Sequence, residues 1–485
     1  MLLGIDQGTS GTTALALDAG GQPVAQAYRP LASQHPQPGW VEQDPEALLA
    51  GLVEAVAEVL DATGGAGRVR AAGLANQGES VLAWDAQSGA ALSPVLVWSD
   101  QRARPLVNAL DAQGHGPAIA RESGLTLSTY FSAPKLRWLL DRHPEVRAAA
   151  RRGTLRLGTL DAWIGVRLGA PNVTDPSTAS RTQLYSLAEG GWSTALTRLY
   201  GVQPDDLPRV VPSAAARGAL TQRAWGGALP WFAGCVDQVA ALLGCGCLEA
   251  GQVKVTYGTG AFVLAQAGRT RPAPVPGLLC SEGWSDRRGR RFVLDGGVFT
   301  AGTALAWLGR LGLLDDPARA SDLARAAQGT VRFLPAFGGT GAPWWEPRAR
   351  GVFAGLSDAS GPAELVRAVL DGIAHSVADI VEAMGGALPT LDRLRADGGL
   401  SRLDYLLQRQ ADLTGLAVER AASPEATALG VALLAGVGAR AVPWSGLAAQ
   451  LPPQASFTPQ LPEAARSQER AAWKSWRARA AALED

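Results

Sequence analysis

Residues 2–17 read LLGIDQGTSGTTALAL, and the fold class depends on this stretch more than on any other. Apolar residues lead up to Asp6, a small polar turn follows, and apolar residues resume at Ala14. A turn rich in glycine and small hydroxyl residues between two apolar runs is typical of a β-hairpin. The sequence therefore predicts a strand that ends on an acid, a tight turn and a second strand.

A stretch of the same kind opens the second half of the chain, where residues 251–266 read GQVKVTYGTGAFVLAQ. In each half a helix and another strand follow. Asp44 and Pro45 have the types of an N-cap and a first helical residue, and the residues after them have helical periodicity. Residues 361–384 have the same periodicity. We expect two α/β halves with a weak internal repeat, divided into an N-terminal domain, 1–243, and a C-terminal domain, 244–485.

Composition excludes several classes of protein. The chain has 485 residues with 44 basic and 44 acidic side chains, so no strong attraction to nucleic acid or to an anionic membrane is expected. The N-terminus lacks the pattern of a signal peptide, and no apolar run reaches the length of a membrane span. The four cysteines are too few for a disulfide scaffold in a chain this long. We expect buried free thiols and a cytoplasmic protein.

Known catalytic signatures are also missing. The sequence contains no GxxxxGK[ST] motif and no GxGxxG that opens a helix, which argues against P-loop and dinucleotide-binding folds. It contains no GxSxG elbow and no HExxH, which argues against common hydrolases.

The turns at 6–13 and 257–262 have the composition of phosphate-binding turns. Glycine lets a backbone approach a ligand closely, and successive N–H groups with hydroxyls can surround an anion. Asp6 before the first turn can hold Mg²⁺ directly or through water. Taken singly, each turn is equally an ordinary hairpin. One such turn in each of two related domains would instead enclose a nucleotide between them.

Asp237 follows an apolar strand and precedes an apolar helix, in the stretch FAGCVDQVAALLG at 232–244. One interpretation is a helix N-cap. The other is a general base that takes a proton from a hydroxyl as this attacks a γ-phosphate.

Residues 76–80, NQGES, form a polar group between apolar neighbours. They are either a surface turn or the floor of a pocket for a polar ligand.

Thirteen segments in register along the chain resemble the FGGY carbohydrate kinases, and within that family the glycerol kinases. They include GIDQGTSGT at 4–12, NQGES at 76–80, VWSDQR at 97–102, STYFSAPKLRWLLD at 128–141, GCVDQVAALLG at 234–244, VTYGTGAF at 255–262, ADGGLSR at 396–402 and EATALGVALLAG at 425–436. The resemblance implies two ribonuclease-H-like domains of the actin and sugar-kinase superfamily with a cleft between them. It also implies ATP, Mg²⁺, a small polyol or sugar substrate and a homo-oligomer.

The resemblance also implies roles for single residues. Asp237 corresponds to the catalytic base, and Asp6 to the acid near Mg²⁺. The polyol pocket corresponds to Gly78, Glu79, Trp98, Tyr130, Asp237, Gln238 and Phe262. The nucleotide site corresponds to Thr9, Ser10, Gly11, Gly258, Thr259, Gly302 and Gly399. With these roles, residues 76–80 are interpreted as a pocket floor, and Glu79 can accept hydrogen bonds from two hydroxyls.

The chain departs from the glycerol kinases at Gly78, where they carry an arginine before the glutamate. Glycine donates no side-chain hydrogen bond and is expected to leave space. Either another residue fills the role and glycerol is the substrate, or the space admits a larger polyol or ketose such as erythritol, xylulose or ribulose. Thr13, Ala306 and Leu403 depart from the family on the nucleotide side. A non-catalytic nucleotide- or sugar-binding regulator is the alternative from another class.

Overall fold

The computed structural model describes residues 1–388 and 390–483. These residues form two compact units, and each unit is built from more than one segment of the chain. The first contains Met1–Gly246, Cys280–Phe292 and Glu425–Gln450, and the second contains Cys247–Leu279, Val293–Pro424 and Leu451–Asp485. The units thus differ from the sequence division at 243/244 in residues 244–246, 280–292 and 425–450, which belong to the first unit.

A six-stranded sheet forms the centre of the first unit, with the strand order β13-β14-β5-β1-β2-β3. Strand β1 pairs antiparallel with β2 and parallel with β5, and β5 pairs parallel with β14. The predicted N-terminal hairpin is confirmed, with Gly8 opposite Gly11. The strands are β1 (Leu2–Gly8), β2 (Gly11–Leu17), β3 (Pro23–Pro30), β5 (Ala71–Asn76), β13 (Ala219–Gln222) and β14 (Gly227–Val236).

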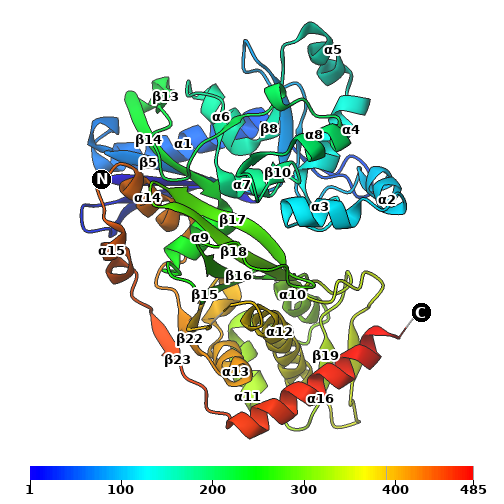
Figure 1. The fold of residues 1–485 in the computed structure, drawn as a ribbon. Helices are drawn as coiled ribbons and strands as arrows, with labels where there is room; N and C mark the ends of the chain where they lie inside the picture. The colour runs from blue at the N-terminus through cyan, green and yellow to red at the C-terminus, as the bar shows by residue number, and fades with distance from the viewer. Residues whose placement is uncertain (389, 484–485) are drawn as a thin grey trace. The chain divides into compact units, whose positions relative to one another are not determined.

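Helices from distant parts of the chain cover the two faces of this sheet (Figure 1). Leu3 and Ile5 of β1 pack in one core with residues of α1 (Pro45–Thr63). Gly4, between them, faces the backbone of α14 (Ala426–Gly438) on the other side. Side chains alternate between the faces of a strand, so each face receives its own helix. Asp44 caps α1 as predicted, since its side chain accepts hydrogen bonds from the N–H groups of residues 46 and 47.

The remaining elements of the first unit position the candidate site. A four-stranded sheet has the order β4-β7-β6-β8. Its strands are β4 (Glu42–Gln43), β7 (Val95–Leu96), β6 (Val81–Asp85) and β8 (Leu155–Thr159). Two short pairs join β9 (Val173–Thr174) to β12 (Arg209–Val210) and β10 (Tyr185–Ser186) to β11 (Gly191–Trp192). The other helices are α2 (Arg104–Ala112), α3 (Gly116–Ser123), α4 (Ser132–Arg142), α5 (Pro144–Arg152), α6 (Leu160–Arg167), α7 (Pro176–Ser180), α8 (Thr194–Tyr200), α9 (Asp237–Gly244) and α15 (Trp444–Leu447).

A seven-stranded sheet has the order β17-β18-β16-β15-β21-β22-β23. From β18 onward this order repeats that of the first sheet read from β3 to β13. Strand β15 pairs antiparallel with β16 and parallel with β21, as β1 does with β2 and β5. The strands are β15 (Gln252–Tyr257), β16 (Ala261–Gly268), β17 (Leu279–Asp286), β18 (Gly289–Val298), β21 (Arg393–Asp397), β22 (Ala417–Arg420) and β23 (Ala455–Phe457). The predicted internal repeat is therefore confirmed.

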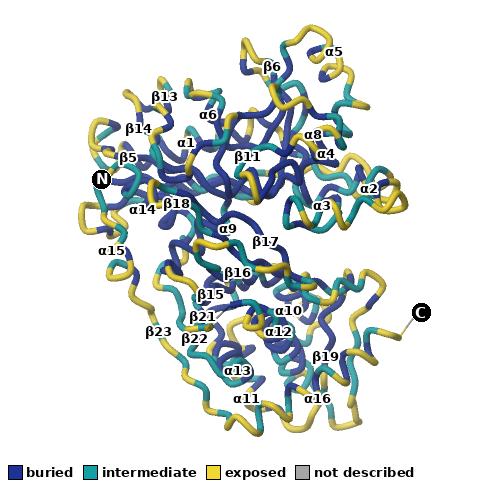
Figure 2. The backbone as a smooth tube through the Cα atoms, in the orientation of Figure 1, coloured by how far each residue is buried: buried dark blue, intermediate teal, exposed yellow. Residues whose placement is uncertain are grey.

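The second unit is completed by α10 (Gly302–Arg310), α11 (Ala320–Ala326), α12 (Pro362–Gly385), α13 (Asp404–Thr414), α16 (Glu463–Ala481) and the strand pair β19 (Arg332–Leu334) and β20 (Val352–Ala354). Helix α12 covers the range predicted to be helical and contacts α11, α13 and β19. Figure 2 shows the central strands of the first sheet mostly buried and the loops exposed.

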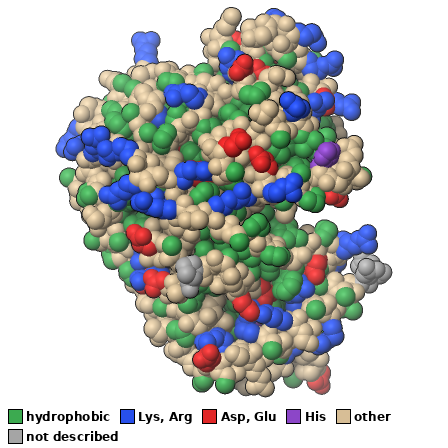
Figure 3. Space-filling model, viewed as in Figure 1, with side chains coloured by type: hydrophobic (Ala, Val, Ile, Leu, Met, Phe, Trp, Pro, Cys, Tyr) green, Lys and Arg blue, Asp and Glu red, His purple; other side chains and the backbone are tan. Residues whose placement is uncertain are grey.

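Other expectations from composition can be compared with the structure. All four cysteines are buried and free, as predicted. None of the helices in the described part of the chain is both long and apolar enough to cross a membrane. On the face drawn in Figure 3, charged side chains of both signs are spread among uncharged ones.

Candidate functional site

The polar residues at 76–80 are buried, so the interpretation as a surface turn is wrong. Gln77 is at the centre of a network of amides. Its amide nitrogen donates to Oε1 of Gln43 over 2.9 Å, and its own Oε1 accepts from the hydroxyls of Thr9 at 3.2 Å and Ser80 at 3.0 Å. Buried polar groups are costly unless they are hydrogen-bonded. The network therefore fixes the loop at 76–80 to the first turn, which carries Thr9.

Glu79 lies in this loop with a strained backbone. Its φ is 61°, a left-handed conformation that is uncommon for a residue other than glycine, and its backbone carbonyl accepts a hydrogen bond from Ser132 Oγ. Its carboxylate is buried and pairs with Arg181, with 2.6 Å between Nε and Oε1. Strain of this kind persists where the surrounding structure holds a side chain in one position.

Two aromatic side chains and a lysine lie around Glu79. The rings of Trp98 and Tyr130 meet edge to face with 5.6 Å between centroids, and Nε1 of Trp98 donates to Thr9 Oγ1 over 3.0 Å. Nζ of the buried Lys135 donates to the carbonyls of residues 129, 130 and 131 over 2.8–2.9 Å. Burial lowers the pKa of Lys135 to about 7, although the charge of Glu79 opposes this shift. Lys135 thus holds the backbone that presents Tyr130.

Asp237 is the first residue of α9, directly after β14. Its Oδ1 accepts a hydrogen bond of 2.6 Å from the N–H of Gln238, and both residues are half-buried. A carboxylate at a helix N-terminus is stabilised by the helix dipole and by free N–H groups. The N-cap of α9 is Val236 and no side chain caps the helix, so the interpretation of Asp237 as an N-cap is wrong. The half-buried carboxylate at the first helical position leaves its role as a general base a prediction.

Asp6 lies at the end of β1, close to other carboxylates. Burial raises its pKa well above the usual range, and the charges of Asp237 and Glu425 add to this shift. Its Oδ1 is shielded from solvent and accepts no hydrogen bond from any residue that the structure describes. A cation would compensate such an oxygen, because hard divalent cations prefer carboxylate ligands. Within residues 1–388 and 390–483, however, no three His, Cys, Asp or Glu side chains are close enough to hold a metal alone.

The first turn connects β1 to β2. Ser10 is exposed, Thr9 is partly exposed, and the carbonyl of Ser10 accepts a hydrogen bond of 2.8 Å from the Tyr28 hydroxyl. Gly11 is buried against β3. The turn is therefore open to a ligand on the Thr9 and Ser10 side and anchored on the other.

The space expected at Gly78 has one close neighbour. A Cβ at this position would lie 2.6 Å from Cγ2 of Val236, the residue before Asp237. The φ of Gly78 is not in the left-handed region, so the backbone itself would accept a side chain. A side chain at 78 would therefore need the methyl group of Val236 to shift, while no other described atom outside the adjacent residues would lie within 4 Å of its Cβ.

The predicted nucleotide residues of the second unit lie together. The N–H of Gly302, which begins α10, donates to the carbonyl of Gly258 over 3.0 Å, and the N–H of Thr303 donates to that of Thr259. A Cβ at Gly302 would lie 2.6 Å from the Gly258 oxygen, so only glycine fits this approach. Gly399 follows the end of β21, the strand parallel to β15, and it is exposed with open space around it.

Phe262, in β16, is partly exposed. Its ring packs on the backbone of Gly297 in β18, where an added Cβ would lie 3.2 Å away. The predicted substrate residues thus fall in two groups, with Phe262 in the second unit and the others in the first.

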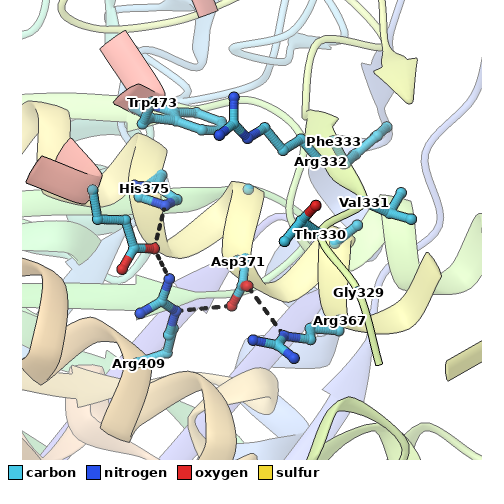
Figure 4. A pocket seen from close by; sticks show the side chains of 13 residues that line it. Gly329, Thr330, Val331, Arg332, Phe333, Arg367, Asp371, His375, Arg409 and Trp473 are labelled. Atoms are coloured by element: carbon cyan, nitrogen blue, oxygen red, sulfur yellow. Dashed lines mark hydrogen bonds and ion pairs between the residues drawn. The ribbon is translucent and has the colours of Figure 1, made fainter. Parts of the chain in front are cut away.

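The second unit also contains a polar cavity of about 240 Å³ that none of the predicted site residues lines. Its charged groups pair with each other, as Figure 4 shows. Arg409 and Arg367 approach the carboxylate of Asp371 at 3.0 and 3.6 Å, and His375 lies 3.3 Å from Glu469. The pairs connect α12, α13 and α16. These contacts give the network a structural role in holding the helices together.

Comparisons with known proteins agree with this geometry. The model of the FGGY family of carbohydrate kinases matches residues 1–244 with its N-terminal domain and residues 253–439 with its C-terminal domain. The chain belongs to the FGGY family of carbohydrate kinases. The recognition made from the sequence and the expected fold of two ribonuclease-H-like units are therefore confirmed.

Individual FGGY kinases match along nearly the whole chain. The chain is 41% identical to a glycerol kinase of Thermus brockianus over 482 residues, which is 98% of this chain and 97% of that protein. It is 40% identical to a glycerol kinase of Aromatoleum aromaticum over 487 residues, with coverages of 98% and 97%. A crystal structure of Plasmodium falciparum glycerol kinase with ADP matches with a TM-score of 0.94 and 27% identity, covering 100% of this chain and 98% of that one.

Sequence reasoning missed two charged residues that lie near predicted site residues, Arg181 beside Glu79 and Glu425 near Asp6. Arg181 was inside a recognised segment but was not singled out, although an arginine directly after the small residues of PSTAS is an unusual charge in a buried stretch. Glu425 stands before α14, whose packing on β1 brings it near Asp6. Its signal was a carboxylate at the start of a strongly apolar helix.

Proposed function

We propose that this FGGY kinase transfers the γ-phosphate of ATP to a terminal hydroxyl of glycerol and forms glycerol 3-phosphate. The observation that carries the proposal is the buried loop at 76–80, whose Glu79 carboxylate pairs with Arg181, a guanidinium that lies 5.9 Å from the ring centroid of Tyr130. The Tyr130 ring in turn meets that of Trp98. A carboxylate that accepts hydrogen bonds, next to aromatic walls that pack on carbon, matches the alternating polar and apolar surface of a short polyol. The glycerol kinases at about 40% identity support the same substrate.

Asp237 acts as the general base in this proposal. It takes the proton of the attacking hydroxyl at a carboxylate oxygen while Glu79 holds the neighbouring hydroxyls. Gln238 and Phe262 contribute further contacts to the polyol. Phosphoryl transfer needs mainly positioning and charge stabilisation, so one aligned carboxylate is sufficient as a base.

Five residues are proposed to contact the phosphates of ATP: Thr9, Ser10 and Gly11 of the first turn and Gly258 and Thr259 of the second turn. Gly302 and Gly399 would contact the rest of the nucleotide. Gly302 begins α10 and donates its N–H to the carbonyl of Gly258 in the second turn, and Gly399 follows β21, the strand parallel to β15. This assignment follows the family, and the P. falciparum structure that matches this chain contains ADP.

Mg²⁺ fits the surroundings of Asp6. The shielded Oδ1 without a hydrogen bond and the nearby carboxylates of Asp237 and Glu425 form an environment that favours a cation. Mg²⁺ usually keeps several waters and is held by one or two carboxylates together with substrate phosphates, so an all-protein cage is not required. When bound, it neutralises charge on the transferring phosphoryl group. A homo-oligomer in the cytoplasm remains the expectation for this kinase.

The test is ADP release from Mg-ATP with glycerol, erythritol, xylitol, D-xylulose, L-ribulose and dihydroxyacetone, with ³¹P NMR to identify the product. A clear preference for glycerol with glycerol 3-phosphate as product supports the proposal. A preference for a four- or five-carbon acceptor contradicts it in favour of a different FGGY kinase. No ADP release with any acceptor would point to the non-catalytic regulator.

A further inference from the structure

We infer that the hydroxyl of Thr9 couples the two substrate sites, so that a nucleotide phosphate at the first turn tightens the binding of the polyol. The inference rests on the proposed function and deepens it, because it concerns how the two substrates affect each other. Thr9 joins the turn that is proposed to contact phosphate to Trp98, an aromatic residue of the proposed polyol pocket.

The hydrogen bond between Trp98 and Thr9 has only one possible direction. Nε1 of Trp98 lies 3.0 Å from Oγ1 of Thr9, and an indole nitrogen donates but never accepts. The Thr9 oxygen therefore accepts from Trp98, and the single proton of the hydroxyl is left for another partner. That partner is Oε1 of Gln77, 3.2 Å away.

The orientation of Gln77 follows independently from the other end of the network. The carbonyl of Thr9 can only accept, so the side-chain atom of Gln43 that lies 2.7 Å from it is the amide nitrogen. The amide oxygen of Gln43 then faces Gln77 at 2.9 Å, so the facing atom of Gln77 is its amide nitrogen. The opposite atom of Gln77, which faces the Thr9 hydroxyl, is therefore an oxygen. Both ends of the network assign the same position to the Thr9 proton.

Trp98 is held at two points, and both lead to the same oxygen. Its backbone N–H donates to Ser80 Oγ over 3.1 Å, and the Ser80 hydroxyl donates to Gln77 Oε1 over 3.0 Å. Gln77 and Ser80 are only 1% and 0% exposed, whereas Thr9 is partly exposed. Of the two residues that donate to Gln77 Oε1, Thr9 is thus the one that a ligand can approach.

A phosphate at the first turn would take the Thr9 proton from Gln77. An ionised phosphate oxygen is a stronger acceptor than a neutral amide oxygen, and a hydroxyl can rotate from one to the other while its oxygen stays in place. Gln77 Oε1 keeps the bond from Ser80, so it is not left unsatisfied. Donation to an anion makes the Thr9 oxygen a better acceptor, because the bonds of a chain polarise one another. The bond from Trp98 is therefore strengthened, and the indole is held more firmly for a polyol.

The coupling must act equally in both directions. If phosphate strengthens polyol binding by a given factor, the polyol strengthens nucleotide binding by the same factor. This coupling factor is the ratio of the glycerol dissociation constants without and with saturating Mg-AMP-PNP, a non-hydrolysable ATP analogue, and isothermal titration calorimetry measures both constants. We expect a factor of about 5 or more for wild type, at the lower end of typical couplings.

Two substitutions should remove the coupling from its opposite ends. Thr9→Val keeps the shape of the side chain without the hydroxyl, and Trp98→Phe keeps an aromatic ring without the N–H. Each should reduce the coupling factor to below about 2. The double variant should have no smaller factor than either single variant, because both substitutions break the same bond. Thr9→Ser, which keeps the hydroxyl, should retain the wild-type factor.

Trp192→Phe is a matched control for Trp98→Phe. Trp192 is also half-buried, its Nε1 donates to the carbonyl of Pro208 over 2.8 Å, and its ring meets a tyrosine, Tyr185, edge to face. The substitution therefore removes an indole hydrogen bond of the same kind at a distance from the first turn. It should leave the coupling factor at the wild-type value.

Ser10→Ala is the corresponding control for Thr9→Val, because it removes the other hydroxyl of the same turn. It should change the affinity for the nucleotide at most, and leave the coupling factor as in wild type. A folded Thr9→Val or Trp98→Phe protein with the wild-type factor would overturn the inference. So would a wild-type protein without coupling, or an equal loss of coupling in Trp192→Phe. If wild type binds no glycerol at all, it is the proposed function that fails.

Discussion

Asp6 in the first unit and Asp371 in the second are both acids within groups of charged side chains, yet their surroundings are opposite. Oδ1 of Asp6 is shielded and receives no hydrogen bond within the described part of the chain, and neighbouring carboxylates raise its pKa further. Oδ1 of Asp371 accepts from both Tyr405 and Arg409, and Arg367 lies beside Oδ2. The first environment is short of positive charge, and the second is already compensated.

The difference shows which group of charges needs a ligand. A charged cluster whose members satisfy each other stabilises the fold and has no need of a substrate. A carboxylate kept in an unfavourable environment lowers stability and is retained where it serves binding or catalysis. The charged groups around the cavity in Figure 4 compensate each other. Asp6, at the end of β1 and near Asp237, is instead a carboxylate in an unfavourable environment.

The largest difference between the two regions is expected in kcat, when one acid of each region is replaced by its amide. We expect Asp237→Asn to lower kcat by about 10²- to 10⁴-fold, because the loss of a general base removes proton transfer from the transition state. Asp371→Asn should leave kcat unchanged. The measurement is ADP release with saturating glycerol and Mg-ATP, with circular dichroism as a check of folding. Substantial activity in a folded Asp237→Asn enzyme would show that another group is the base.

The free energy of unfolding, unlike kcat, should be lowered by the substitution of Asp371. Asp371→Asn removes the charge that two arginines share, and its carboxylate is only 20% exposed. We expect a loss of about 1–3 kcal/mol in the free energy of unfolding, because the arginines lose a charged acceptor. Urea denaturation measures this loss. A variant as stable as wild type would mean that the network of Figure 4 does not hold the helices together.

The sequence predicted the architecture well, because the decisive signals were local. The two hairpins at 2–17 and 251–266, the N-cap at Asp44 and the helix at 361–384 all depend on neighbours in the chain. The assignment of segment 425–450 could not be made in this way. Helix α14 (Ala426–Gly438) packs on β1 (Leu2–Gly8) and α9 (Asp237–Gly244), both far from it in the chain, and only tertiary structure reveals these contacts.

The candidate site also has features that the sequence could predict and features that it could not. The residues at 76–80 alone left a surface turn and a pocket floor open, and the family resemblance favoured the pocket floor; the loop is buried. The roles of Glu79 and Asp237 came from the family resemblance. The surroundings of Gly78 could not be inferred from its motif, because a Cβ there would meet the side chain of Val236, 158 residues away.

Replacing Asp6 by asparagine tests, through the melting temperature, whether the charge of Asp6 is unfavourable in the folded protein. Asp6→Asn should raise the melting temperature of the ligand-free protein at pH 8 by about 2 °C or more, while activity is lost. A raised pKa in the folded state means that the ionised carboxylate destabilises the fold. The stabilisation should therefore be present at alkaline pH and disappear as the pH falls toward the pKa of an unfolded aspartate, about 4. Differential scanning calorimetry at both pH values measures it, and a melting temperature lowered at pH 8 would contradict the picture of an uncompensated Asp6.

The smallest effect is expected at Glu469, on the edge of the paired network. Although burial opposes the shift, hydrogen bonds with His375 and Arg409 lower the pKa of Glu469 to about 2. A lowered carboxyl pKa stabilises the folded state above the unfolded value near 4.3, and this stabilisation is lost as the pH falls toward 2. Glu469→Gln should thus reduce the free energy of unfolding by less than about 1 kcal/mol at pH 7, because the carboxylate is one-third exposed. Urea denaturation at pH 7 and near pH 3 should show the gap between wild type and variant closing in acid. A gap that widens in acid would mean that Glu469 stabilises the fold in its protonated form, and the contrast with Asp6 would then disappear.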